Sequence, residues 1–379
     1  MDLSPGTIVK LAALAVLFAP LAAAGRPGAA QDKPNRLADA LMAGLGSARE
    51  PGAAILVRKD GQVVYIGVRG VADLQAMRPI DGRTAFRLAS VTKPFTAAAV
   101  MLLVRDGRLR YEDALTDIFP EFPAYGRGIT VRHLLNHTSG LPDYEDLMPP
   151  VDPAGPVEPG QIDDRGVLAL LQRRTSGLFA PGARWRYSNS GYVLLGLIVE
   201  RVSGRSFPDV LRERIFRPLG MSNTVAHVRG RTTVGDRAFG HTKEAGRWRL
   251  TDQSPTSATL GDGGIYSSLY DLSLWDEALR RHTLLSQEEM ALATTPVRVP
   301  GQGPTGPDGA PAAYGFGWFL DAWKGHPRMW HYGETVGFRT AIQRFTADGL
   351  TVIVLANRSD VEAAPLALKV AGFFLEGER

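Results

Sequence analysis

The sequence predicts an α+β fold, an α/β sandwich. In this fold an antiparallel sheet is built from hairpins at both ends of the chain, is flanked by helices, and has a large, mostly helical insertion. Two pairs of β-rich runs carry this prediction, because an Asp-Gly dipeptide between such runs is a strong hairpin signal. The pairs are residues 53–58 and 62–68 around Asp60-Gly61, and residues 340–345 and 350–355 around Asp348-Gly349. We therefore expect the two ends of the chain to meet in one sheet and to form one folding unit.

Helical patterns fill most of the remaining chain. The run at residues 95–104 is almost wholly apolar, which predicts a helix buried on all sides. Pro-rich stretches at residues 149–159 and 296–311 predict surface loops. We expect a single domain over residues 31–379, with a helical subdomain at about residues 90–260. The other expected helices are residues 35–42, 166–174, 192–202, 207–216, 271–281, 287–293 and 361–375.

The first thirty residues differ from the rest and predict a signal peptide. An apolar run at residues 11–24, broken by Pro20, is followed by small residues at 22–24 and 28–30, and either group fits a cleavage site. The run is too short for a membrane span. We expect an exported chain, periplasmic or secreted, with no stable membrane span after cleavage. A retained N-terminal anchor is the alternative.

Composition excludes several classes of site. The 379 residues contain no cysteine, so disulfides, a thiol nucleophile and Cys-ligated zinc are excluded. The net charge is only +4, and no run of five basic residues occurs, so a nucleic-acid partner is not expected. We expect a small-molecule or peptide substrate and no cofactor. The sequence does not indicate an oligomeric state.

The first candidate catalytic pair is Ser90 and Lys93, directly before the apolar helix. Positions i and i+3 of a helical turn share a face, so the lysine amine can approach the serine hydroxyl. A serine nucleophile needs a base, and a desolvated lysine can serve as one. Only seven of the 43 basic residues are lysines, and arginine cannot act as a base. A lysine at position 93 is therefore a stronger candidate for a base than it would be in a lysine-rich chain. The alternative is a surface lysine near a helix-capping serine.

The second candidate segment holds Tyr187 and Asn189, in a loop rich in turn-forming residues. A phenol flanked by the cations of Arg184 and Arg186 can reach a pKa useful for proton transfer. The Asn189 amide can orient Lys93 and a substrate carbonyl. The alternative is a structural tyrosine that packs its ring and hydrogen-bonds through its hydroxyl.

The third candidate segment is His331-Tyr332-Gly333-Glu334. Glycine at position 333 would let a substrate approach an edge strand closely. A backbone N–H there would stabilise an oxyanion together with the N–H of Ser90. The alternative is a structural histidine before a strand.

Together and in this order, these segments resemble the serine β-lactamase and penicillin-binding superfamily. The chain is most similar to its class C branch, which also contains esterases, D-aminopeptidases and D-alanyl-D-alanine carboxypeptidases. The resemblance covers about residues 35–375. The matching segments are residues 88–93, 133–141, 187–189, 263–267 and 314–318, and His331-x-Gly333 followed by Gly337-Phe338.

This resemblance implies roles for the candidate residues. Ser90 would form an acyl-enzyme, Lys93 and Tyr187 would share the general-base and general-acid work, and Asn189 would orient Lys93 and substrate. His331 stands where class C β-lactamases carry a lysine that holds the β-lactam carboxylate, and a neutral imidazole offers a hydrogen bond with less charge. Glu334 would bring a carboxylate near the oxyanion hole unless its side chain points away. Both departures favour esterase or peptidase activity over efficient β-lactam hydrolysis.

Two further clusters have simpler interpretations. His133 and His137 are spaced as a metal pair on a helix, but residues 138–140 break a helix, and we expect no metal site. Asp143, Glu145 and Asp146 form an acidic loop that favours a solvated rim over an acid/base pair.

The sequence therefore predicts a serine hydrolase that cleaves an ester, amide or peptide bond through a Ser90 acyl-enzyme. The alternative is a penicillin-binding or peptidoglycan-sensing module with little or no turnover.

Overall fold

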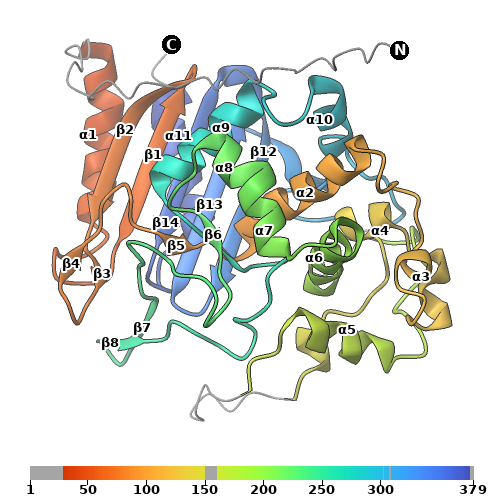
Figure 1. Cartoon of the computed structure of the whole chain (residues 1–379). Coiled ribbons are helices and arrows are strands. Elements are labelled where there is room, and N and C mark those ends of the chain that lie inside the picture. The colour runs from red at the N-terminus through yellow and green to blue at the C-terminus, as the bar shows by residue number, and fades with distance from the viewer. Residues whose placement is uncertain (1–28, 150–159, 302, 307–308, 376–379) are drawn as a thin grey trace, which may run out of the picture.

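The computed structural model describes residues 29–149, 160–301, 303–306 and 309–375, and a seven-stranded sheet forms its centre (Figure 1). The strand order is β10-β11-β12-β13-β14-β1-β2, and each neighbouring pair runs antiparallel. The strands are β10 (Ala313–Tyr314), β11 (Phe319–Trp323), β12 (His326–Thr335), β13 (Phe338–Phe345), β14 (Leu350–Ala356), β1 (Ala53–Lys59) and β2 (Gln62–Arg69). Strand β14 pairs with β1, so the predicted meeting of the two chain ends in one sheet is confirmed.

Both predicted hairpins are present, but their turns differ. In the first, Asp60 and Gly61 adopt left-handed φ values of 50° and 81°, as a tight two-residue turn requires. In the second, a 3₁₀ turn (Thr346–Asp348) precedes Gly349, whose φ is 60°. The backbone N–H of Asp60 donates to the carbonyl of Gly349 at 2.9 Å, which ties the two turns together.

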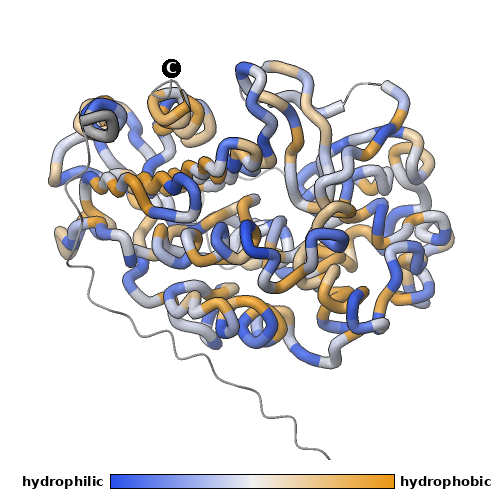
Figure 2. Tube along the Cα trace, turned by 90° about the horizontal axis from the view of Figure 1, so that it is seen from above, coloured by the Kyte–Doolittle hydropathy of each residue, from blue (hydrophilic) through white to orange (hydrophobic). Residues whose placement is uncertain are grey.

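Helices cover both faces of the sheet. Ile55 and Val57 of β1 pack in a cluster with α1 (Ala29–Ala43) and α11 (Ala363–Leu375), which lie side by side on one face (Figure 2). Leu56, between them, faces the main core on the opposite side. Burial on both faces explains why β1 is a continuous apolar run rather than an alternating one.

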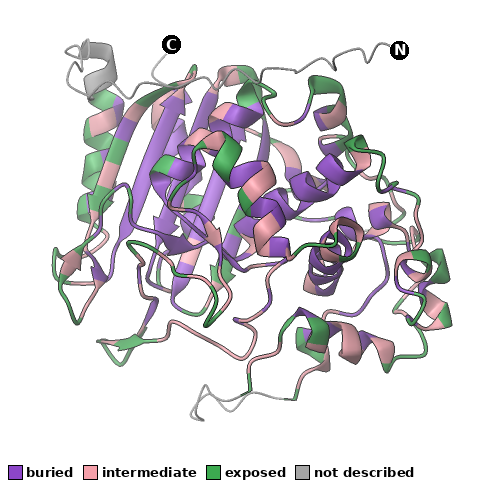
Figure 3. Cartoon of the chain, viewed as in Figure 1, coloured by how far each residue is buried: buried purple, intermediate pink, exposed green. Residues whose placement is uncertain are grey.

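The insertion between the hairpins is mostly helical, as predicted. Most predicted boundaries are shifted by one to three residues, and the segment predicted as one helix over residues 207–216 is divided by a π-helical turn (Arg212–Phe216). The predicted apolar helix is α2, which is buried from Lys93 to Leu103 (Figure 3). The main helices are α2 (Lys93–Arg105), α4 (Val131–Leu135), α5 (Asp164–Gln172), α6 (Asn189–Ser203), α7 (Phe207–Leu211), α9 (Leu269–Arg280) and α10 (Gln287–Ala293).

Strands β10, β11 and β12 were not predicted. Strand β12 contains a proline and a glycine, both of which weaken a strand pattern, and its burial does not alternate along its middle. The described parts of the Pro-rich stretch at 296–311 hold no helix or strand beyond a bridge between Thr305 and Pro311, while residues 150–159 of the other stretch lie outside the described residues.

The predicted signal peptide lies almost entirely outside the described residues, which begin at Ala29 with helix α1. That helix starts six residues before the predicted one at 35–42. Among the residues that the structure describes, no helix is both long enough and apolar enough to cross a membrane.

Candidate active site

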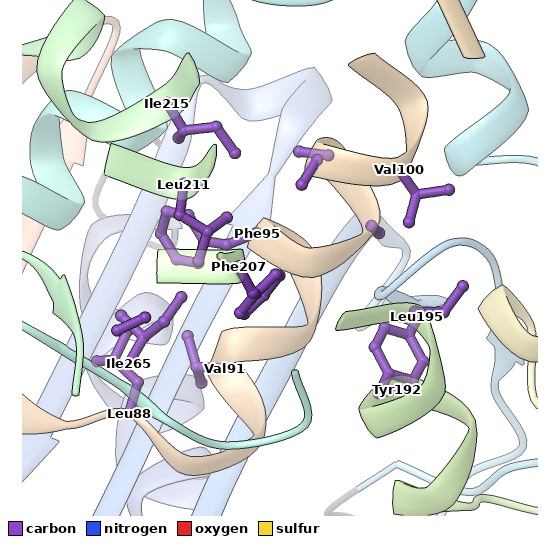
Figure 4. Packing of buried hydrophobic residues seen from close by; sticks show 14 of the residues in the cluster. Leu88, Val91, Phe95, Val100, Tyr192, Leu195, Phe207, Leu211, Ile215 and Ile265 are labelled. Atoms are coloured by element: carbon purple, nitrogen blue, oxygen red, sulfur yellow. The ribbon is translucent and has the colours of Figure 1, made fainter. Parts of the chain in front are cut away.

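Ser90 is held on a strained turn between a strand and the buried helix. Strand β5 (Phe86–Arg87) leads into a 3₁₀ turn (Ala89–Thr92), and Ala89 adopts a left-handed φ of 48°. Such a conformation costs a non-glycine residue about 1–3 kcal/mol. Burial of Leu88 and Val91 on either side contributes about 1.5–3 kcal/mol each, which outweighs the strain. These side chains anchor the turn in the core, near Phe95 of α2 (Figure 4).

The amine of Lys93 makes three contacts inside the protein. Its Nζ lies 2.9 Å from Ser90 Oγ, 2.8 Å from Asn189 Oδ1 and 3.1 Å from the carbonyl oxygen of Asp262. The two carbonyl-type oxygens only accept, so they satisfy two N–H bonds of the amine. In a neutral amine the third position is a lone pair, and it faces the hydroxyl of Ser90. This geometry suits a base that removes the serine proton.

Burial favours that neutral form of Lys93. The side chain is fully buried, and desolvation lowers its pKa to about 8. The nearby carboxylates of Asp262, Asp143 and Glu145 act in the opposite direction and limit the fall. About a tenth of Lys93 is therefore unprotonated at pH 7, and the neutral form increases as the pH approaches 8.

The structure brings Tyr187 to the same serine. Its side chain lies beside that of Ser90, which acts to lower the pKa of the phenol, and the Lys93 amine lies 4.8 Å from the centre of its ring. Burial raises the pKa of Tyr187 well above its usual value, contrary to the lowering expected from its arginine neighbours. Arg186 instead points to the surface and pairs with Asp146 at 3.0 Å. Tyr187 is thus a neutral phenol at physiological pH, suited to donating a proton.

The sequence interpretation missed two carboxylates beside the site, those of Asp143 and Asp262. Asp143 Oδ2 accepts the backbone N–H of Asn189 at 2.7 Å, which fixes the first turn of α6 and hence the Asn189 side chain. Asp262 is buried, and its side chain accepts the hydroxyl of Tyr144 at 3.1 Å. Asp143 belongs to the acidic loop that we interpreted as a solvated rim, while Asp262 stands in a glycine-rich segment with no distinctive signal.

These carboxylates influence one another. Burial and the neighbouring carboxylates raise the pKa of Glu145 to about 7, and burial raises that of Asp143. Glu145 is exposed at the surface, whereas Asp143 is half-buried. The carboxyl groups of Asp143, Glu145 and Asp262 therefore lie together beside Lys93, and Glu145 is about half ionised near pH 7.

Gly333 packs against the turn that carries Ser90. A Cβ at this position would lie 2.1 Å from the carbonyl oxygen of Leu88 and 3.1 Å from Cβ of Ala89. The hydroxyl of Thr340 on β13 donates to the same carbonyl at 2.7 Å. Strand β11 pairs with β12 only as far as Trp330, so at Gly333 the strand has β13 on one side and no strand neighbour on the other among the described residues, in agreement with the expected edge. The glycine is required here because the strand and the turn that carries Ser90 are in direct contact.

His331 differs from its expected role, because both ring nitrogens already have partners. Nδ1 lies 2.7 Å from the carbonyl oxygen of Tyr332, which only accepts, so Nδ1 carries the proton. Nε2 then accepts from the hydroxyl of Tyr314 at 3.1 Å. Burial and the nearby Lys93 lower the pKa of His331 to about 3. The imidazole is neutral and supports the site from within the core.

Glu334 is exposed, while Gly333 before it is buried, as the alternation of a strand requires. Its side chain therefore points away from the turn that carries Ser90. No grouping of three or more histidine, aspartate or glutamate side chains placed to hold a metal ion occurs in the part of the chain that the structure describes. His133 instead forms a capping box with Thr130 at the start of α4.

Comparisons with known proteins identify the family of this chain. The family model for beta-lactamase matches residues 35–372. Penicillin-binding protein 4* of Bacillus subtilis is 33% identical over 88% of this chain and 74% of its own length. A D-aminopeptidase of Brucella anthropi is 31% identical over 81% of this chain, which spans only 56% of that relative.

The fold is also similar to that of a solved structure. The D-amino acid amidase of Ochrobactrum anthropi SV3, in complex with L-phenylalanine amide, superposes with a TM-score of 0.74 at 25% identity. The match covers 92% of this chain and 98% of the amidase. The chain belongs to the beta-lactamase family of serine hydrolases.

Proposed function

We propose that this chain cleaves an amide, peptide or ester bond through an acyl-enzyme on Ser90. The observation that carries the proposal is the contact of Lys93 with the Ser90 hydroxyl, with Tyr187 placed beside the same serine. Neutral Lys93 takes the proton of Ser90 as Oγ forms a bond to the substrate carbonyl carbon. The bond to the leaving group then breaks, Tyr187 donates its proton to that group, and the proton held by Lys93 restores the phenol. Water later attacks the acyl-enzyme, and the same groups accept and return its proton.

The backbone N–H of Ser90 and one from the segment around Gly333 are proposed to hold the oxyanion. The close packing of Gly333 on the Ser90 turn supports this role, because it keeps the two segments in contact. Asn189 would orient Lys93 and the substrate carbonyl.

Labelling with a fluorophosphonate probe tests the proposal. Wild-type protein should be labelled and Ser90→Ala should not. Lys93→Arg keeps the positive charge but cannot act as a base, so its acylation rate should fall by about 10²–10⁴-fold. Circular dichroism confirms that both variants are folded. Undiminished hydrolysis by Ser90→Ala contradicts the proposal.

For the substrate class we propose amides or peptides of amino acids with a free ammonium group, of D-configuration. The carboxylates of Asp143 and Glu145 beside Lys93 support a cationic substrate. The names of the D-aminopeptidase and the D-amino acid amidase support the configuration. Hydrolysis of D-phenylalanine amide, L-phenylalanine amide and N-acetyl-D-phenylalanine amide should be fastest for the first. Equal rates for all three contradict this class.

A second candidate, stable acylation by penicillins, is favoured by the similarity to penicillin-binding protein 4*. Mass spectrometry after exposure to penicillin distinguishes a stable adduct from turnover. The missing lysine at position 331 argues against efficient β-lactam hydrolysis, because the neutral, buried imidazole offers no charge to a carboxylate. Nitrocefin turnover should therefore be slow.

We also propose that the chain is exported, because residues 11–24 and the small residues after them have the pattern of a cleaved signal peptide. Expression of the full chain in a bacterium, followed by cell fractionation and N-terminal sequencing, should place the protein outside the cytoplasm, with a new N-terminus after residue 24 or residue 30. Recovery of uncleaved protein in the membrane fraction would indicate a retained anchor instead.

A further inference from the structure

We propose that His137 is a positioning residue that sets the place of the Tyr187 hydroxyl through contacts on both sides of that tyrosine. The proposal rests on the proposed role of Tyr187 as proton donor. His137 is the buried histidine that the sequence offered as half of a metal pair.

The contacts of His137 bracket Tyr187 along the chain. The backbone N–H of Arg186 donates to the carbonyl oxygen of His137 at 2.9 Å, and that of Ser188 donates to its ring Nδ1 at 3.2 Å. The residues before and after Tyr187 are thus both bound to one histidine. The imidazole also lies against the phenol ring, with ring centres 4.3 Å apart.

The protonation state of His137 follows from these contacts. Nδ1 accepts the N–H of Ser188, so in the neutral ring the proton is on Nε2. A second proton would occupy Nδ1 and break the contact with Ser188. The ring is only 1% exposed, Nε2 lacks a hydrogen-bond partner among the described residues, and burial holds the pKa of His137 well below its usual value. The imidazole therefore stays a neutral acceptor.

The backbone of His137 is shaped for this task. Its φ is 61°, a left-handed value that is uncommon outside glycine, although histidine, like asparagine and aspartate, adopts it more often than most residues. This conformation occurs where the carbonyl and the ring both meet the 186–188 segment. The ring is enclosed by other aromatic side chains, those of Trp185, Tyr192 and Tyr314, which leave it one position. The fixed imidazole in turn restricts the Tyr187 ring that packs against it to one position.

A matched pair of substitutions separates this role from simple packing. In His137→Asn the amide oxygen can occupy the place of Nδ1, and asparagine tolerates the left-handed backbone. In His137→Gln the amide lies one carbon further out and cannot reproduce that contact. A misplacement near 1 Å can cost about 10²-fold, so kcat of His137→Gln should fall by about that factor with little change in KM, and His137→Asn should stay within about fivefold of wild type.

A double-mutant cycle distinguishes the positioning of Tyr187 by His137 from a general structural role of His137. If His137 acts through Tyr187, then in the Tyr187→Phe background His137→Gln should lower kcat by no more than about threefold, since the hydroxyl being positioned is already absent. Fluorophosphonate titration gives the concentration of intact sites, and thermal unfolding checks each variant. If His137→Gln does not fold, His137→Gly, which tolerates the left-handed backbone but lacks the acceptor, takes its place in the same cycle.

The outcomes are distinct. Wild-type kcat in His137→Gln, equal losses in the Asn and Gln variants, or a full multiplicative loss in the double variant would each overturn the inference while leaving the proposed function in place. Full activity of Tyr187→Phe alone would overturn both the role of Tyr187 and the inference. Loss of activity in Tyr187→Phe, together with the pattern above, supports both.

Discussion

The amine of Lys93 donates to the side-chain oxygen of Asn189 across 2.8 Å, and this contact joins the first turn of α2 to the first turn of α6. It fixes the direction of the lone pair that faces Ser90. A substitution at Asn189 in α6 should therefore change the fraction of Lys93 that is protonated.

The rate of acylation should follow the protonation of Lys93. Its pKa is lowered to about 8 by burial, so the active, neutral form increases with pH until that value is passed. We expect kcat/KM to rise about tenfold per pH unit below 7 and to level off above 8.5. Stopped-flow or steady-state assays from pH 5 to 10 measure this profile. A profile that is flat over this range contradicts a lysine base.

Replacing Asn189 by aspartate should move that profile. Asn189→Asp keeps the shape of the side chain and places a negative charge 2.8 Å from Nζ, which stabilises the ammonium form. The rising limb should shift to higher pH by about one unit or more, and activity at pH 7 should fall about tenfold or more. Asn189→Ala is the control, because it removes the acceptor without adding charge. An unshifted limb in the aspartate variant would show that another group carries the titration.

Removing the negative charge of Glu145 should weaken the binding of a substrate ammonium group. It should also lower the pKa of Lys93, whereas Asn189→Asp should raise it. An exposed ion pair contributes about 0.2–1 kcal/mol, so Glu145→Gln should raise KM for D-phenylalanine amide by up to about fivefold. KM for the N-acetylated amide should not change. The rising limb of the pH profile should move slightly lower, because this carboxylate raises the pKa of Lys93. An equal rise in KM for both amides would contradict recognition of the ammonium group.

A methyl group at position 333 should separate the strand from the catalytic turn. Gly333→Ala places Cβ 2.1 Å from the Leu88 carbonyl, so the backbone must shift. We expect a loss of about 1–3 kcal/mol in the free energy of unfolding, measured in urea, and a fall in kcat. Gly235→Ala is the matched control, since its Cβ would meet nothing within 4 Å. Wild-type stability and kcat in Gly333→Ala would contradict the required contact.

We propose that residues 31–379 unfold as one unit, because β14 pairs with β1 along its whole length. Calorimetry should show one transition, with equal calorimetric and van 't Hoff enthalpies. Two separated transitions would instead indicate that the helical subdomain is independent.

The sequence was informative wherever the signal was local. Asp60-Gly61 identified a hairpin, and the spacing of Ser90 and Lys93 was sufficient to place both on one helical turn. Contacts between distant segments gave no such signal. The pKa of Tyr187 depends on burial by residues far along the chain, so its arginine neighbours were a poor guide. For the same reason Asp262, which contacts Lys93 only through its backbone, was not recognised.

The position of β12 to β14 has a consequence for synthesis. A nascent chain that has emerged only as far as residue 300 already contains Ser90, Lys93 and Tyr187, yet it lacks the strands that join β1 to the rest of the sheet and that press Gly333 against the Ser90 turn. Such long-range pairing forms late. A chain still on the ribosome would therefore be unable to react with acyl donors around it, and acylating power would arise only after the last strands have been made.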